Sequence, residues 1–99
     1  MKDIIISADN ECKIYSVPDK VADNLEGYCS CFGKWLHSSP NAKKYRFGED
    51  AYYNEEDFID YLNQWVFPKE KSIFIETIGW IETDDDIPKK YRDCPRFNF

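Results

Sequence analysis

The feature that most constrains the fold is an amphipathic stretch, Pro18–His37. At about 100° per residue, its apolar and polar side chains fall on opposite arcs, with Leu25 at the centre of the apolar arc. That arc also holds Val21, Ala22, Tyr28, Cys29, Phe32, Trp35 and Leu36. Pro18 suits a first helical turn, because its φ is fixed and it has no N–H to leave unpaired. The stretch therefore predicts one long helix that buries a single face.

Two glycines lie inside this predicted helix, and each costs about 1 kcal/mol relative to alanine. Gly33 flanks the apolar arc, where a missing side chain would permit a close backbone approach. Gly27 lies on the polar side, and the pattern gives no reason for it.

Three segments are rich enough in β-branched and alternating apolar residues to predict strands. Asp3–Ala8 and Cys12–Val17 flank Asp9-Asn10, a pair that suits a tight hairpin turn because both residues tolerate positive φ. Lys71–Ile81 is the third strand, and Gly79 within it predicts a bulge.

A second helix is predicted from Asn54 to Phe67-Pro68. Asn54 is a good N-cap residue, and Asp57 stands where a capping-box acid would be. The apolar side chains of this helix share one arc: Phe58, Ile59, Leu62, Trp65 and Val66. The preceding segment, 42–53, is predicted to be a connecting loop with a short strand around Tyr45–Phe47.

The order β-β-α-α-β predicts an α+β fold, a two-layer sandwich of a three-stranded, mainly antiparallel sheet with two helices on one face. At 99 residues and 42% hydrophobic content, we expect a single domain, 1–99. The sheet face without helices would carry Tyr15, Phe74, Ile78 and Trp80. The aromatic C-terminal tail, Tyr91–Phe99, is expected to cover it, and any uncovered remainder would form an apolar interaction patch.

Charge and hydropathy restrict the partners and the location. Residues 51–99 carry six Lys/Arg against eleven Asp/Glu, so five of the six net negative charges lie there. This distribution argues against direct nucleic-acid binding and favours a protein partner with a basic surface. The N-terminal apolar run is too short for a secretory signal, and no segment approaches the roughly 18 apolar residues of a membrane span. We therefore expect a cytoplasmic protein with reduced cysteines.

No pattern of residues predicts catalysis, a cofactor or a metal. Cys29 and Cys31 would point roughly 200° apart on a helix, and neither Cys12 nor Cys94 has a second ligand at the usual spacing. His37 has no nucleophile or orienting acid in a recognisable order and suits the last turn of its helix instead. We therefore expect that the chain is not an enzyme.

Acidic and aromatic residues are the remaining candidates for function. The second predicted helix presents Glu56, Asp57 and Asp60, and an acidic turn adds Asp84, Asp85 and Asp86. If these side chains converge, they form one acidic face, with Tyr61 and Trp65 as aromatic anchors for a basic partner. Helix capping and a solvated helix face would also account for the acids at 55–60.

The leading hypothesis is a small acidic protein-binding module that inhibits a basic or nucleic-acid-binding partner. Bacterial immunity proteins and anti-CRISPR proteins are similar to this chain in size and charge only. One alternative is a cysteine-based metal-binding or redox protein. Another is a structural domain that self-associates, as a homodimer, through an uncovered sheet face or a strand edge.

Overall fold

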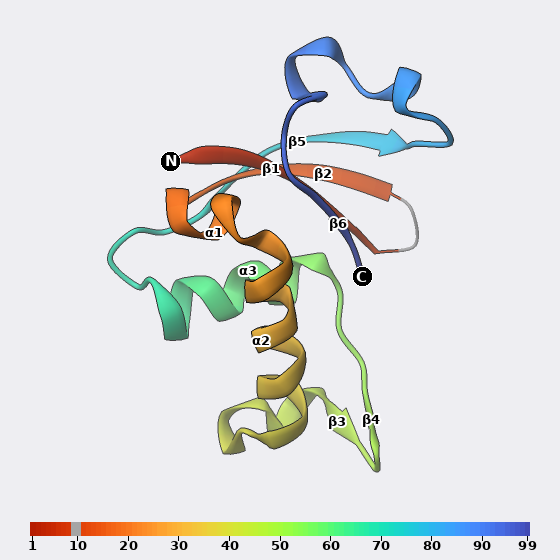
Figure 1. Cartoon of the computed structure of the whole chain (residues 1–99). Coiled ribbons are helices and arrows are strands. Elements are labelled where there is room, and N and C mark those ends of the chain that lie inside the picture. The colour runs from red at the N-terminus through yellow and green to blue at the C-terminus, as the bar shows by residue number, and fades with distance from the viewer. Residues whose placement is uncertain (9–10) are drawn as a thin grey trace.

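The computed structural model describes residues 1–8 and 11–99 of the chain. Its main element is a mixed sheet with the strand order β5-β2-β1-β6 (Figure 1). In that order the strands span Ile73–Trp80, Glu11–Val17, Lys2–Ala8 and Arg96–Asn98. The α+β class and the three predicted strands are confirmed. The predicted three-stranded sheet is wrong, because part of the C-terminal tail pairs with β1 as a parallel fourth strand.

β1 and β2 form the predicted antiparallel hairpin, with Ile5 opposite Ile14. The turn predicted at Asp9-Asn10 lies outside the described residues. Side chains alternate along β1, so that Ile4 and Ile6 face one side of the sheet and Ile5 faces the other. All three isoleucines are buried, and both faces of the sheet are therefore covered at β1.

The predicted long helix is two helices, α1 (Asp19–Asp23) and α2 (Leu25–Ser38), which are separated at Asn24. Asn24 has a φ of −144°, which is outside the helical region. Asparagine also has a low intrinsic helix propensity. A Cβ at Gly27 would collide with the end of the Asn24 side chain, which would have to shift if Gly27 were replaced. The prediction of one continuous helix is therefore wrong at Asn24.

The second predicted helix is α3 (Glu55–Tyr61), which continues into a π-helical turn, Leu62–Val66. Asn54 Oδ1 accepts a hydrogen bond from the backbone N–H of Asp57 at 3.1 Å, and Asp57 Oδ2 accepts one from the N–H of Asn54 at 2.9 Å. This reciprocal pair is a capping box. The predicted start of the helix is therefore confirmed.

Replacing Asn54 by alanine is expected to lower the free energy of unfolding by about 1 kcal/mol, because the first turn of α3 loses its side-chain acceptor. Urea denaturation of the variant and the wild type measures this difference. The matched control is Asn41→Ala, an exposed asparagine that should change the stability by less than about 0.5 kcal/mol. Equal losses in the two variants would contradict a specific role for the cap.

Both helices pack on the sheet face that carries Ile4 and Ile6, as predicted (Figure 1). Phe32 of α2 is fully buried there. Its ring centroid lies 5.6 Å from that of Phe58 in α3 and 5.9 Å from that of the C-terminal Phe99. None of the helices in the described part of the chain is long and apolar enough to cross a membrane.

Residues 81–94 cover the other face of the sheet. This segment contains two short 3-10 helices, η3 (Asp84–Asp86) and η4 (Lys89–Tyr91). Ile87 and Tyr91 are buried against the β1 and β2 side chains that face away from the helices. The two-layer prediction is therefore incomplete, because this irregular segment forms a third layer.

The aromatic tail is divided between the two faces. Tyr91 packs on the second face, whereas Phe97 and Phe99 pack on the helix side. Tyr15, predicted for the face without helices, also lies on the helix side, where its ring packs edge-on against Phe74 at 5.5 Å. Ile78 packs in the second core, as predicted, whereas Phe74 lies on the helix side, because two irregularities in the β2–β5 pairing interrupt the alternation along β5.

The segment between α2 and α3 contains a 3-10 helix, η1 (Pro40–Tyr45), and a small hairpin of β3 (Arg46–Phe47) and β4 (Asp50–Ala51). The short strand predicted near Tyr45–Phe47 is thus confirmed. Gly48 in the turn has a φ of +67°, which favours glycine.

Candidate partner-binding site

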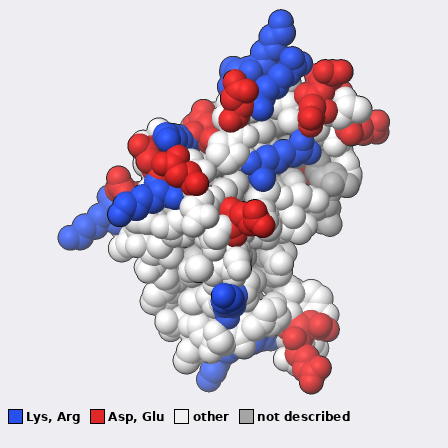
Figure 2. All heavy atoms as spheres, in the orientation of Figure 1, with Lys and Arg blue, Asp and Glu red and all other residues white. Residues whose placement is uncertain are grey.

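The acidic residues that were expected to form one surface lie on opposite sides of the main sheet. α3 carries Glu56, Asp57 and Asp60 on the helix side, and η3 carries Asp84–Asp86 on the other side. In Figure 1, α3 lies below the strands and the blue segment after β5 lies above them. Figure 2 shows basic side chains interspersed among the acidic ones on the visible face. The expectation of a single acidic face is therefore wrong.

Two of the η3 acids have local structural roles. Asp86 Oδ2 accepts hydrogen bonds from the backbone N–H groups of Glu82 and Thr83, each at 3.1 Å. Asp84 Oδ1 lies 3.4 Å from Arg96 Nη1, in an exposed ion pair with β6. Capping and ion pairing within the chain thus account for these two carboxylates, and no binding partner is needed to explain them.

Two of the α3 acids line a groove between α3, β2 and β5. Glu56 and Asp60 contribute the carboxylates, and the cavity has a volume of about 430 Å³. The remaining lining residues are Lys13, Tyr15, Ile59, Phe74 and Thr77. This "acidic groove" therefore combines negative charge with aromatic and aliphatic walls, as a recognition site for a basic, partly apolar segment requires.

Lys13 neutralises only part of the negative charge at the acidic groove. Its Nζ lies 2.8 Å from Glu55 Oε1 and 3.2 Å from Glu56 Oε1. The hydrogen bond that Lys13 donates to the Glu55 carboxylate is the main reason that the pKa of Lys13 is raised well above its usual range. One ammonium thus faces two carboxylates, and Asp60 adds a third, so the acidic groove keeps a net negative charge.

Asp60 makes this charge sensitive to pH. Partial burial is the main cause that raises the pKa of Asp60, and the nearby Asp57 raises it further. Asp60 therefore takes up a proton earlier, as the pH falls, than an aspartate in water.

β5 forms one edge of the sheet and pairs only with β2 among the described strands. Its side chains Ile73, Phe74, Ile75 and Trp80 are 59%, 51%, 43% and 68% exposed. Gly79 has a φ of +81° beside a register shift, which confirms the predicted bulge. An edge strand of this length presents backbone N–H and C=O groups that another strand can pair with. The sequence shows that this strand is apolar, but only the strand order places it at the edge of the sheet.

Tyr61 and Trp65, the predicted aromatic anchors, lie beside α2 and do not line the acidic groove. The ring centroid of Tyr61 is 5.0 Å from that of Trp35 and 5.3 Å from that of Phe32. Trp65 is 50% exposed, with its ring 6.4 Å from Trp35. The structure thus places both rings against Trp35 of α2.

The cysteines lie in different environments. Cys29 is buried on the helix side, and burial raises the pKa of its thiol to about 12, whereas Cys31 is exposed. Cys94 is half-buried in the second core. Within residues 1–8 and 11–99, no three His, Cys, Asp or Glu residues lie close enough together to hold a metal ion. His37 lies in the last turn of α2, as predicted.

No family model matches the chain, and no curated protein or solved structure matches it either. The geometry and charge of the chain's own residues therefore have to indicate its function.

Proposed function

We propose that the chain is a protein-binding module that accepts an extended, basic segment of a partner protein as an additional strand beside β5. One observation carries the proposal: the edge strand and the acidic groove are adjacent. Phe74 and Thr77 of β5 line the same groove as Glu56 and Asp60 of α3. A strand added to this edge would therefore present its side chains to the carboxylates.

The backbone of the added segment would supply most of the attachment. Strand addition satisfies the unpaired N–H and C=O groups of an edge, while alternate side chains enter the sites on either face. On the helix side these side chains would meet the acidic groove. On the other side they would meet exposed apolar residues such as Ile73.

Charge would contribute more to the choice of partner than to the binding affinity. Glu56 is 60% exposed, and exposed ion pairs are each worth only about 0.2–1 kcal/mol. Complementary charge does accelerate the encounter and reject acidic competitors. The excess of acids over residues 51–99 extends this preference beyond the acidic groove.

A basic surface that this module covers would no longer be open to nucleic acid. We therefore propose inhibition of a nucleic-acid-binding partner as its biological effect.

A second candidate occupant of the same edge is another copy of this chain. Lys69 and Lys71 precede β5, whereas Glu82 and Asp84 follow it. Antiparallel pairing of two β5 strands would bring the basic end of each copy beside the acidic end of the other. This self-complementarity favours a homodimer over the other modes of self-association.

The test uses defined peptides: one seven-residue peptide that alternates lysine with valine, and one that alternates glutamate with valine. The Lys/Val peptide is expected to bind and to shift the NMR signals of the β5 amides. The Glu/Val peptide should bind at least about fivefold more weakly, because two ion pairs are replaced by repulsion. Binding of the Lys/Val peptide should also weaken as acidification protonates Asp60.

The variant with Glu56→Gln and Asp60→Asn should lose the preference for the basic peptide. The variant with Asp84→Asn and Asp85→Asn has the same net charge on the other side of the sheet and should keep it. The proposal would be overturned if both variants lost the preference for the basic peptide equally, or if the peptide shifted NMR signals remote from β5. A stable dimer in light scattering of the protein without peptide would instead identify the second copy as the occupant.

A further inference from the structure

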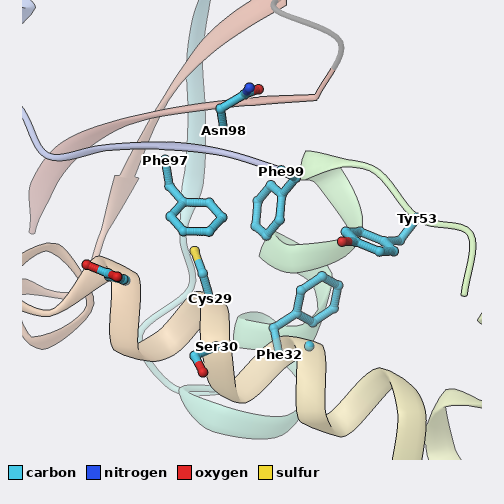
Figure 3. Close-up of a pocket in the computed structure, with 9 residues that line it drawn as sticks. Cys29, Ser30, Phe32, Tyr53, Phe97, Asn98 and Phe99 are labelled. Atoms are coloured by element: carbon cyan, nitrogen blue, oxygen red, sulfur yellow. The ribbon is translucent and has the colours of Figure 1, made fainter.

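A second cavity, independent of β5, lies between α2 and the C-terminal residues. We call it the aromatic cavity; it has a volume of about 330 Å³. Figure 3 shows Phe97 and Phe99 directed from the C-terminal segment toward α2, with Phe32 below and Tyr53 to one side. Cys29 completes the wall between Phe97 and α2. Its volume falls within the range of small-molecule sites, about 300–1,000 Å³.

The aromatic rings are held in place by one another. The ring centroid of Phe99 lies 4.9 Å from that of Phe97, 5.8 Å from that of Tyr53 and 5.9 Å from that of Phe32, all in edge-to-face arrangements. This mutual packing makes the walls of the aromatic cavity preorganised, so that little conformational entropy would be lost on binding.

Two of the polar side chains that line the aromatic cavity are directed away from its rings. In Figure 3, Asn98 and Ser30 point away from the rings. Asn98 Oδ1 instead accepts a hydrogen bond from Ser7 Oγ at 2.8 Å. Cys29 presents a neutral thiol at physiological pH, because burial raises its pKa to about 12.

Gly33 keeps this space open. Apart from the adjacent residues and the backbone of α2, no atom of the described residues lies within 4 Å of the position that a Cβ on Gly33 would occupy, although the residue lines the aromatic cavity. The predicted close backbone approach at Gly33 is therefore wrong. An alanine would fit and would favour the helix by about 1 kcal/mol. The glycine thus enlarges the cavity without serving the packing of α2.

The charge at the aromatic cavity indicates the chemistry of its ligand. Glu26 is the one charged residue that lines it, and no Lys or Arg does so among the described residues. Aromatic rings and a carboxylate attract organic cations, and aromatic cages recognise quaternary ammonium groups in this way. An inorganic cation would gain little from walls of carbon and keep its water instead.

We propose that the aromatic cavity binds a small organic cation with an alkylated ammonium group. The half-buried rings of Phe97 and Phe99 contact the alkyl groups, and the Glu26 carboxylate compensates the positive charge.

The test compares choline with 3,3-dimethylbutan-1-ol, its uncharged carbon analogue, in NMR titrations of the full chain. Choline is expected to shift the ring signals of Phe97 and Phe99 and to bind about tenfold more tightly than the analogue. Equal affinity of the two molecules would overturn the proposal, as would choline-induced shifts confined to other parts of the surface.

Two variants test the cavity itself. Gly33→Leu directs a side chain into open space and should fold normally but lose choline binding. Glu26→Gln, an exposed substitution that leaves the core intact, should weaken the binding of choline and leave the binding of the analogue unchanged. The matched control is Glu49→Gln, which removes one negative charge from the β3–β4 turn and should bind choline like the wild type. Unchanged choline binding in Gly33→Leu and Glu26→Gln would exclude the aromatic cavity as the site.

Discussion

Replacing Phe32 by alanine is expected to lower the free energy of unfolding by about 4 kcal/mol, within the range of about 3–5 kcal/mol found for buried phenylalanines. Phe32 is fully buried, and its ring contacts those of Tyr53, Phe58, Tyr61 and Phe99. Truncation would leave a cavity where α2, α3 and the C-terminal residues meet. Neighbouring rings cannot close this cavity, because each also packs against other groups.

Urea denaturation at equilibrium measures this loss, with Phe47→Ala as the control. Phe47 is 80% exposed in the β3–β4 hairpin, and its replacement should change the stability by less than about 0.5 kcal/mol. A loss below about 1.5 kcal/mol for Phe32→Ala would mean that the helices do not meet around this ring.

Replacing Lys13 by methionine should destabilise the protein by about 3 kcal/mol, because the Glu55 carboxylate loses its partner in a site that water scarcely reaches. Glu55 is only 6% exposed, and Lys13 Nζ lies 2.8 Å from its Oε1. The double variant with Glu55→Leu should recover much of the loss, since it removes the unpaired charge.

Glu56→Gln is the matched control for this ion pair. Glu56 lies 3.2 Å from the same ammonium but is 60% exposed, so its neutralisation should cost at most about 0.5 kcal/mol. Similar losses in Lys13→Met and Glu56→Gln would show that burial of Glu55 does not decide the effect.

The pH dependence of the Lys13 ion pair has a defined sign. The folded protein raises the pKa of Lys13 above its ordinary value of 10.5. The stabilisation is therefore present in full below that ordinary value and is lost as the pH rises through the raised one. The stability difference between wild type and Lys13→Met should stay constant around neutral pH and shrink in strong alkali.

Local signals in the sequence predicted the elements well. The spacing of apolar residues placed both main helices, and Asn54 with Asp57 predicted a cap that requires only neighbouring backbone groups. Gly79 predicted a bulge, which likewise depends on the local backbone. Asn24 was the exception, because a single poor helix former inside a strongly amphipathic stretch gives a weaker signal than the stretch itself.

The candidate sites were less accessible to prediction. Glu56 and Asp60 were identified as acids on a solvent-facing helix, but their neighbours Lys13 and Phe74 come from two different strands. The α3 acids were expected to lie beside Asp84–Asp86. This prediction was wrong because the sequence does not determine on which side of a sheet a turn will fold. Phe97 and Phe99 were expected to dock, and their actual side depended on the parallel pairing of β6 with β1.

By itself, the sequence determined the α+β class, the hairpin, the capped helix and the acidic bias of residues 51–99, because propensity, periodicity and charge are properties of neighbouring residues. Only the tertiary structure decided the strand order, the edge position of β5, the Lys13–Glu55 ion pair and the two cavities. These features join segments distant in the chain, and their geometry depends on how the side chains of all the layers pack together.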